Sequence, residues 1–307
     1  MQRLDGGASI PSHLADGIVA LGNFDGFHLG HQAVVARAIA WAKAEGRPAL
    51  VATFDPHPVR HFRPDTPAFR LTTLDQRERL FADAGADAMV VFHFDGDLAA
   101  LTAEQFVADR LERNLRIGGV VTGEDFTFGH AKSGTVHTLA ARGPVHGFRA
   151  ETVGAVALDG ETVSSTRIRE ALRAGDMATA TRLLTRPFAI EGVVQHGDKL
   201  GRTIGYPTAN LDMGNYLRPA YGIYAVTGRL DDGRVLKGAA NLGIRPSFDP
   251  PKELLEPHFF DFAESLYGQT IEVALIDYLR PEAKFDSLDA LIAQMDIDCD
   301  RARTILG

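Results

Sequence analysis

Two histidines three residues apart, His28 and His31, stand in the string GNFDGFHLGH between an apolar run and a helical pattern. At that spacing, two side chains lie near each other at a helix N-terminus. The exposed N–H groups and the helix dipole there attract anions. The string therefore predicts a nucleotide phosphate site, in which both imidazoles would stabilise charge on a transferring phosphoryl group. The alternatives are a tight turn with incidental histidines, or a transition-metal pair, for which no third ligand is obvious.

A second string, VSSTRIR at residues 163–169, opens a predicted helix. Its hydroxyls, backbone donors and guanidinium are suited to phosphate oxygens. A helix cap with solvent-facing arginines is the alternative interpretation. The candidate phosphate-binding residues are Ser164, Ser165, Thr166 and Arg167.

A third string, GYPTANL at residues 205–211, follows a glycine-containing segment at 197–202 that includes Gly201. Thr208 and Asn210 are hard oxygen donors two residues apart, so both point the same way in extended backbone and would hold Mg²⁺ against a nucleotide. The glycines would let the loop close over phosphates. The alternative is an ordinary Pro-Thr-Asn turn, since each residue is a common turn former.

The elements that position these strings differ between the two halves of the chain. Short continuous apolar runs separated by helical patterns predict an open parallel α/β sheet over roughly residues 15–160. The expected strands are Gly17–Leu21, Ala49–Phe54, Ala88–Phe92 and Gly118–Thr122. A helix is expected over Leu29–Ala44, with Val34, Ala38, Trp41 and Ala42 on one face, and a capping box at Thr102 and Gln105 opens another.

From Arg186-Pro187 onward, closely spaced β-rich segments predict a small antiparallel barrel. The expected strands are Phe188–Val194, Gly222–Gly228, Val235–Asn241, His258–Phe262 and Thr270–Tyr278. A terminal helix is expected over Asp286–Leu306, with its five aspartates between Phe285 and Asp300 on a solvated face. The predicted domains are residues 1–185 and 186–307.

Composition limits the function classes. A chain of 307 residues favours two domains, and 45% hydrophobic residues exclude bulk disorder. The net charge of -8 opposes a nucleic-acid partner. The N-terminus has no apolar signal region, no run long enough to span a membrane occurs, and the single Cys299 suits a reducing compartment, so a cytoplasmic protein is expected.

The H-x-G-H pattern resembles the nucleotidylyltransferase superfamily, in which these histidines contact ATP phosphates, and S-S-T-x-x-R resembles its second signature. The longer string GNFDGFHLGHQ resembles prokaryotic bifunctional riboflavin kinase/FMN adenylyltransferases, also called FAD synthetases. TFDPHP and VTGEDFTFG resemble further segments of the first module. GYPTANL, NLGIRPSF, EPHFFDF and YLRPEAKF follow in the order of the flavokinase module.

The resemblance implies that riboflavin and ATP give FMN in the barrel, that FMN and ATP then give FAD in the first domain, and that Mg²⁺ serves both reactions. It implies His28, His31, Arg167 and Glu256 as catalytic, with Glu256 as the general base. ATP would also contact Gly22, Asn23, Phe24 and Gly30, its triphosphate would contact Ser164, Ser165 and Thr166 besides Arg167, and in the barrel ATP would contact Gly201, Thr208 and Asn210. Flavin would contact Phe54, Asp125, Phe126, Phe128 and Arg280.

Two positions depart from the family pattern. Thr127 replaces an expected basic residue, and Pro257 lies directly after Glu256. Pro257 places Glu256 in extended geometry and predicts that the strand starts there or lies at an edge, after a Pro-rich loop at 249–255. Two alternative functions stay open: a kinase whose first domain is inactive or altered, and a non-catalytic flavin-binding regulator. The oligomeric state is not predicted.

Overall fold

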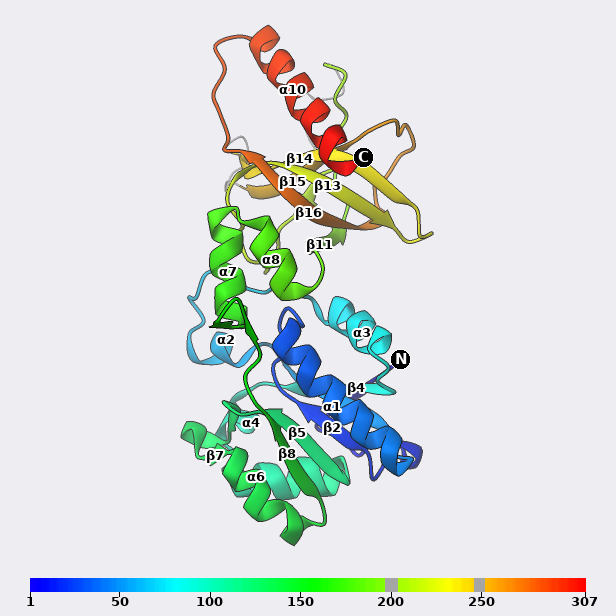
Figure 1. The fold of residues 1–307 in the computed structure, drawn as a ribbon, viewed down its shortest axis with the longest axis vertical. Coiled ribbons are helices and arrows are strands. Elements are labelled where there is room, and N and C mark those ends of the chain that lie inside the picture. The colour runs from blue at the N-terminus through cyan, green and yellow to red at the C-terminus, as the bar shows by residue number, and fades with distance from the viewer. Residues whose placement is uncertain (197–203, 246–251) are drawn as a thin grey trace. The chain divides into compact units, whose positions relative to one another are not determined.

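The computed structural model describes residues 1–196, 204–245 and 252–307, and its chain divides into two compact units (Figure 1). The first unit comprises Met1–Pro67 and Thr73–Ser164, and the second comprises Ala68–Thr72 and Ser165–Gly307. The domain boundary predicted at 185/186 therefore lies after two helices that compactness assigns to the second unit. One reason is a backbone hydrogen bond from Ala220 N–H to the Leu172 carbonyl, 3.0 Å long, which ties the first of these helices to the later chain.

The first unit is built on a six-stranded sheet, ordered β1-β4-β3-β2-β5-β8, in which every neighbouring pair is parallel. Its strands are β1 (Gln2–Asp5), β2 (Ile18–Leu21), β3 (Ala49–Asp55), β4 (Ala88–His93), β5 (Gly119–Gly123) and β8 (Arg149–Val153). The four strands that sequence analysis expected are the inner ones. It missed β1 and β8 at the two edges, because their residues are polar and lack a continuous apolar run.

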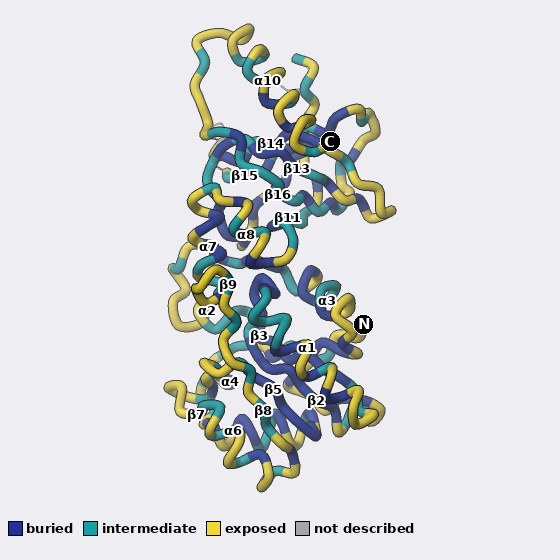
Figure 2. The backbone as a smooth tube through the Cα atoms, in the orientation of Figure 1, coloured by how far each residue is buried: buried dark blue, intermediate teal, exposed yellow. Residues whose placement is uncertain are grey.

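The inner strands are apolar throughout because both faces of the sheet are covered. Along β2, Val19 and Leu21 enter one hydrophobic cluster, while Ile18 and Ala20 enter another. The second cluster includes the predicted face of the first helix. Figure 2 shows these strands as buried segments.

Helices and short turns connect the strands of this sheet. The main ones are α1 (Leu29–Glu45), α2 (Pro58–Phe62), α3 (Leu74–Asp83), α4 (Gly96–Ala100), α5 (Ala103–Gln105), its continuation η2 (Phe106–Asn114), and α6 (Val136–Arg142). Three shorter turns are η1 (Ser12–Leu14), η3 (His130–Lys132) and η4 (Gly143–His146), and two small hairpins pair β6 (Thr127–Phe128) with β7 (Gly134–Thr135) and β9 (Ala157–Leu158) with β10 (Glu161–Thr162). The predicted capping box is confirmed, since Thr102 and Gln105 each accept the other's backbone N–H.

The second unit opens with α7 (Ser165–Ala174) and α8 (Met177–Leu184), followed by an antiparallel sheet ordered β11-β16-β13-β14-β15-β12. Its strands are β11 (Phe188–Val193), β12 (Leu211–Asp212), β13 (Gly222–Leu230), β14 (Val235–Arg245), β15 (Lys252–Phe259) and β16 (Thr270–Arg280). A backbone bond from Gln195 N–H to the Asn210 carbonyl, 2.8 Å long, joins the ends of β11 and β12 and so closes the sheet toward a barrel. The predicted barrel and the terminal helix α10 (Leu288–Leu306) are confirmed.

The prediction for β15 was wrong in its bounds. The strand begins at Lys252 rather than at Pro257 or His258, and residues 252–255 belong to it rather than to a loop. Pro257 sits inside the strand, paired with Ala240 of β14. The regular pairing with β12, its outer neighbour, ends at Leu255, and at Pro257 the outer side of β15 receives a single backbone bond, from Ala209 N–H to the Pro257 carbonyl, so the proline removes one donor at an edge of the ladder.

Candidate active sites

The loop after β2 carries the first histidine string. The order of strands reverses at β2, whose neighbours are β3 and β5, and ligands bind outside the carboxyl ends of strands at such a reversal. The loop turns sharply, with positive φ at Phe24 (49°), Gly26 (87°) and Phe27 (43°). The rings of Phe24 and Phe27 pack edge-to-face on Phe81 of α3, with centroids 5.8 and 5.1 Å away, and this packing offsets the cost of the positive φ angles.

His28 and His31 meet at the N-terminus of α1, as the spacing predicts. Their rings stack with centroids 3.6 Å apart at 21°. His28 is the N-cap, and its Nδ1 accepts the His31 backbone N–H at 3.4 Å. Because Nδ1 accepts, the neutral imidazole carries its proton on Nε2, so its other ring nitrogen is a hydrogen-bond donor.

Two other predicted ATP-site residues fit this arrangement. Asn23 Oδ1 is buried and accepts no hydrogen bond from any described residue, so it is placed to accept one from a ligand. A Cβ added at Gly30 would lie 3.2 Å from the His28 ring and 3.6 Å from the Val163 carbonyl oxygen. The absence of a side chain at Gly30 therefore lets Val163, the first residue of the second string, lie next to His28.

Sequence analysis missed Arg77 of α3, a buried arginine that connects two of the predicted strings. Its Nη1 donates to the Asn23 carbonyl at 3.1 Å and to Thr53 Oγ1 at 2.8 Å, and its Nη2 lies 3.5 Å from Asp55 Oδ1. Thr53 in turn donates to the Asn23 carbonyl at 2.8 Å. Arg77 thus joins the loop after β2 to the end of β3. In the sequence, Arg77 is one of two arginines in a polar helix, and its partners are 22 to 54 residues away, so no local pattern marks it.

The second string is divided between the units. Ser164 is the last residue of the first unit, and Ser165, Thr166 and Arg167 form the first turn of α7 in the second. The arginine at the last position of S-S-T-x-x-R is Arg169, which donates to the Phe69 carbonyl at 2.9 Å and lies over the Phe69 ring. Phosphate binding by Ser164 through Arg167 stays a prediction.

The predicted flavin-side aromatics divide into buried and accessible residues. Phe54 and Phe128 are each only 6% exposed and belong to the hydrophobic core, where they contact Phe92 and Phe106. Phe126 is half-buried and stacks on Phe128 at 5.8 Å, while Asp125 and the departing Thr127 are exposed. Of this group, the structure leaves Phe126 and Asp125 accessible to a ligand, and flavin contact by all four stays a prediction.

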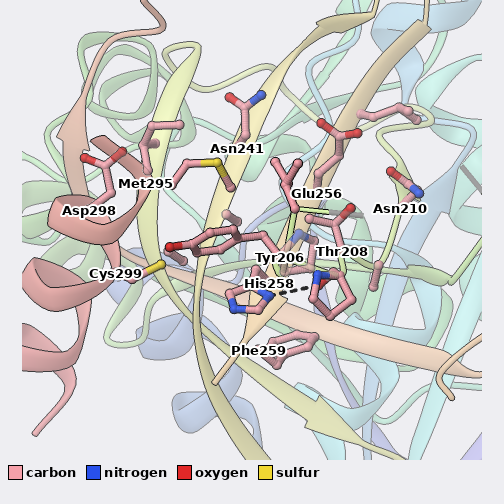
Figure 3. Close-up of a pocket in the computed structure, with 18 of the residues that line it drawn as sticks. Tyr206, Thr208, Asn210, Asn241, Glu256, His258, Phe259, Met295, Asp298 and Cys299 are labelled. Carbon is pink, nitrogen blue, oxygen red and sulfur yellow. Dashed lines mark hydrogen bonds between the residues drawn. The ribbon is translucent and has the colours of Figure 1, made fainter. Parts of the chain in front are cut away.

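A cavity of about 1010 Å³ opens in the second unit, between the barrel and α10. Four of the residues predicted for the kinase site line it: Thr208, Asn210, Glu256 and Arg280. They come from the segment before β12, from β15 and from β16, so the closed sheet brings together groups up to 72 residues apart. Figure 3 shows the labelled side chains around this cavity. Gly201 lies outside the described residues.

The polar wall of the cavity is formed by β14 and β15. Glu256 is half-buried and pairs in register with Asn241 of β14. Asn241 Nδ2 donates to Glu282 Oε1 at 3.4 Å, and its buried Oδ1 finds no donor in the described part of the chain. A buried acceptor of this kind costs about 1–3 kcal/mol unless a donor reaches it, so Asn241, which sequence analysis did not select, is suited to accept a ligand hydroxyl.

The opposite wall is α10. Arg280 of β16 is bound by Asp298, which is 4% exposed, so the prediction of a wholly solvated acidic face is wrong at Asp298. The Tyr206 hydroxyl donates to Asp296, and this bond raises the pKa of Tyr206 to about 12. Cys299 is half-buried in this wall, and burial raises the pKa of its thiol to about 11, so it is a filler rather than a reactive thiol.

The donor set of the cavity suits a hard cation rather than a transition metal. Within residues 1–196, 204–245 and 252–307, no group of three or more His, Cys, Asp or Glu side chains is arranged to bind a metal ion. Thr208 and Asn210 offer two neutral oxygens, and Mg²⁺ commonly takes one or two protein groups and completes its shell with waters and substrate phosphates.

Comparison with known proteins agrees with this division of sites. A family model described as FAD synthetase matches residues 10–167, and one described as riboflavin kinase matches residues 184–306. A bifunctional riboflavin kinase/FMN adenylyltransferase of Escherichia coli (strain K12) is 39% identical over 94% of this chain and 93% of its own. The protein of the same description from Bacillus subtilis (strain 168) is 36% identical over 95% of each chain.

A solved structure from Streptococcus pneumoniae superposes with a TM-score of 0.88 at 31% identity, covering 99% of both chains. That protein is described as a macrolide-efflux protein. In the described ranges of the present chain, no helix combines the length and apolar character needed to cross a bilayer.

Proposed function

The chain belongs to the family of bifunctional riboflavin kinase/FMN adenylyltransferases. We propose which of its residues carry out each of two consecutive reactions. Riboflavin and ATP give FMN and ADP in the second unit. FMN and a second ATP then give FAD and pyrophosphate in the first. The observation that carries the proposal is the meeting of Thr208, Asn210 and Glu256 in one cavity large enough for a flavin and a nucleotide.

In the kinase reaction, Glu256 is the general base. Its carboxylate accepts the proton of the riboflavin 5′-hydroxyl as that oxygen attacks the γ-phosphorus of ATP, and ADP leaves. Asn241 Oδ1, buried beside Glu256, accepts a hydrogen bond from a hydroxyl of the bound flavin and so orients the polyhydroxyl side chain of riboflavin. Arg280, which lines the same cavity, is oriented by its ion pair with Asp298.

Thr208 and Asn210 are the residues that would bind Mg²⁺ in this unit. When bound, the cation supplies charge that neutralises the phosphates of ATP. The contribution of the chain is to place both oxygens on one side of an extended segment facing the cavity.

In the adenylyltransferase reaction, a phosphate oxygen of FMN attacks the α-phosphorus of ATP and pyrophosphate leaves, so no protein nucleophile is required. The chain contributes position and charge. His28 donates from Nε2, as the bond at its Nδ1 dictates, and His31 lies stacked against it. Asn23 Oδ1 and the first N–H groups of α1 complete the set that faces the nucleotide.

The test is chromatographic product analysis of purified protein incubated with riboflavin, ATP and MgCl₂ and sampled over time. We expect FMN to appear first and FAD to follow. A reaction that stops at FMN would show that the first unit is inactive or has another substrate, with the exposed Thr127 as the first position to examine. Riboflavin left unchanged would overturn the kinase assignment, and bound but unconverted flavin would favour a regulator.

A further inference from the structure

The segment that carries Thr208 and Asn210 runs antiparallel to β15, which carries Glu256. Leu211 and Asp212 of β12 pair with Leu255 and Leu254 of β15. A backbone bond from Ala209 N–H to the Pro257 carbonyl, 2.9 Å long, continues the same register. This register places Asn210 opposite Glu256 and Thr208 opposite His258, and directly opposite residues in antiparallel strands point to the same face.

Two prolines weaken this pairing where the site needs it. In a regular antiparallel pair, Ala209 and residue 257 would each donate one hydrogen bond to the other. Pro257 has no N–H, so only the bond donated by Ala209 can form. Pro207, two residues earlier, also lacks a donor. On the side that faces β15, the backbone around Thr208 is therefore held by fewer hydrogen bonds than β12, whereas Asn210 is also held on the other side by its bond from Gln195 N–H.

The imidazole of His258 supplies a bond at this point. Its Nδ1 lies 2.9 Å from the carbonyl oxygen of Pro207. A carbonyl oxygen only accepts, so Nδ1 carries the hydrogen and donates. A dashed line marks this bond at the His258 ring in Figure 3, next to Thr208. The backbone of His258 is itself held in the sheet, where it pairs with Ala239 of β14.

Aromatic neighbours hold the ring of His258 in place. Tyr206 contacts it edge-to-face at 5.2 Å between centroids, and Phe260 contacts it at 6.1 Å. Tyr206 is in turn bonded to Asp296 of α10. An imidazole confined in this way loses little freedom when it makes its hydrogen bond, so the bond is a fixed part of the cavity wall.

We propose that His258 is a positioning residue of the kinase site, whose side-chain bond to the Pro207 carbonyl compensates for the donor that Pro257 lacks and sets Thr208 and Asn210 against Glu256. The inference rests on the proposed kinase function. Both His258 and Glu256 lie on the same face of β15, two residues apart, so the strand that supplies the base also fixes the segment that supplies the nucleotide-binding oxygens.

Two substitutions of the same residue separate the bond from the bulk of the ring. The amide nitrogen of Asn occupies nearly the position of Nδ1, so His258→Asn keeps the donor. The longer Gln places its amide where Nε2 was, so His258→Gln loses it. We expect H258Q to lower kcat/KM for riboflavin phosphorylation about 100-fold, since a misplacement near 1 Å costs that much. KM for ATP at fixed Mg²⁺ should rise, and H258N should stay within about tenfold of wild type.

The first unit serves as an internal control, because FMN adenylylation in the same H258Q chain should keep its wild-type rate. A second variant tests the compensation directly. Pro257→Ala returns an N–H facing the Ala209 carbonyl, so P257A/H258Q should regain at least tenfold over H258Q, whereas P257A alone should change little. Such coupling between neighbours is what a double-mutant cycle measures.

The outcomes decide between the alternatives. Equal losses in H258N and H258Q, or wild-type kinetics in H258Q, would overturn the proposal. Recovery in P257A/H258Q supports it even where H258Q unfolds at a lower temperature, because the restored donor acts on the same pairing. Absence of riboflavin phosphorylation by the wild-type chain would instead overturn the proposed function and this inference with it, a result distinct from any difference among the variants.

Discussion

Arg280 of β16 donates to both carboxylate oxygens of Asp298 on α10, at distances of 2.7 to 3.1 Å. Gln294 of the same helix donates to that carboxylate at 3.0 Å. The pair fastens the terminal helix to the barrel along the cavity, so it determines where one wall of the kinase site lies.

We expect Asp298→Ala to lower the free energy of unfolding of the second unit by about 3 kcal/mol, because it leaves a largely buried guanidinium without its charge partner. The matched control is R280L/D298L, which removes both charges and should recover more than half of the loss. Denaturant unfolding of each variant measures this. Unchanged stability in D298A would show that the pair contributes nothing to anchoring α10.

Removal of Arg77 should impair FAD formation selectively. Arg77→Met deletes the bonds to the Asn23 carbonyl and Thr53, and we expect FMN adenylylation to fall at least tenfold while riboflavin phosphorylation is retained. The control is Arg113→Met, since Arg113 is exposed and pairs only with Asp109 in the interactions that the structure describes. Equal effects of the two substitutions would contradict a specific role for Arg77.

Glu256→Gln should stop the first reaction and spare the second. A general base contributes about 10²–10⁴-fold to the rate, so formation of FMN from riboflavin should fall by that factor. FAD formation from supplied FMN is the measured control. A loss of both activities in a folded variant would contradict the separation of the two sites.

His31→Ala should have the opposite effect. The imidazole stacked on His28 stabilises charge in adenylyl transfer, and loss of one such group costs about 10²–10³-fold. Accumulation of FMN without FAD in the riboflavin time course would show this. Normal FAD formation by H31A would remove the histidine pair from the mechanism.

The stability of the first unit should depend on pH through His146 of η4. Hydrogen bonding to Glu112, and then to Glu104, raises the pKa of His146 above its ordinary 6.5. The raised pKa means that protonation stabilises the folded state. This contribution is fully present below about pH 6.5 and is lost as pH rises through the folded-state value.

His146→Gln removes that dependence. The difference between wild type and H146Q in the denaturant midpoint should therefore be larger at pH 6 than at pH 9. Hydrogen bonds to Arg142 and His146 also lower the pKa of Glu104 to about 2. The stability that ionised Glu104 contributes is therefore fully present above pH 4.5 and is lost only as the pH falls from 4.5 toward 2, outside the range of this comparison. A difference that is constant between pH 6 and 9 would exclude the protonated pair.

Much of the architecture was predictable because its causes are local. The apolar runs at β2 to β5 and the Thr102–Gln105 capping box depend on residues a few positions apart, and both are found as expected. The histidine pair belongs to this class too, since a helix N-terminus brings residues i and i+3 together wherever the helix lies. Sequence also identified the family, because its strings are contiguous.

The remaining features depend on where distant segments return. Arg77 and Asn23 are 54 residues apart, and neither marks the other in the sequence. The same holds for Arg280 with Asp298, which turned a residue expected in solvent into a buried partner, and for His258 with the Pro207 carbonyl, 51 residues away. The sequence around Pro257 predicts that a strand starts there or lies at an edge; β15 starts earlier, at Lys252, and Pro257 lies beyond the end of its regular pairing with the short strand β12. The residue types of these sites could be recognised from local sequence. Their hydrogen-bond partners could not, because those partners are brought together only by packing between segments that are far apart in the chain.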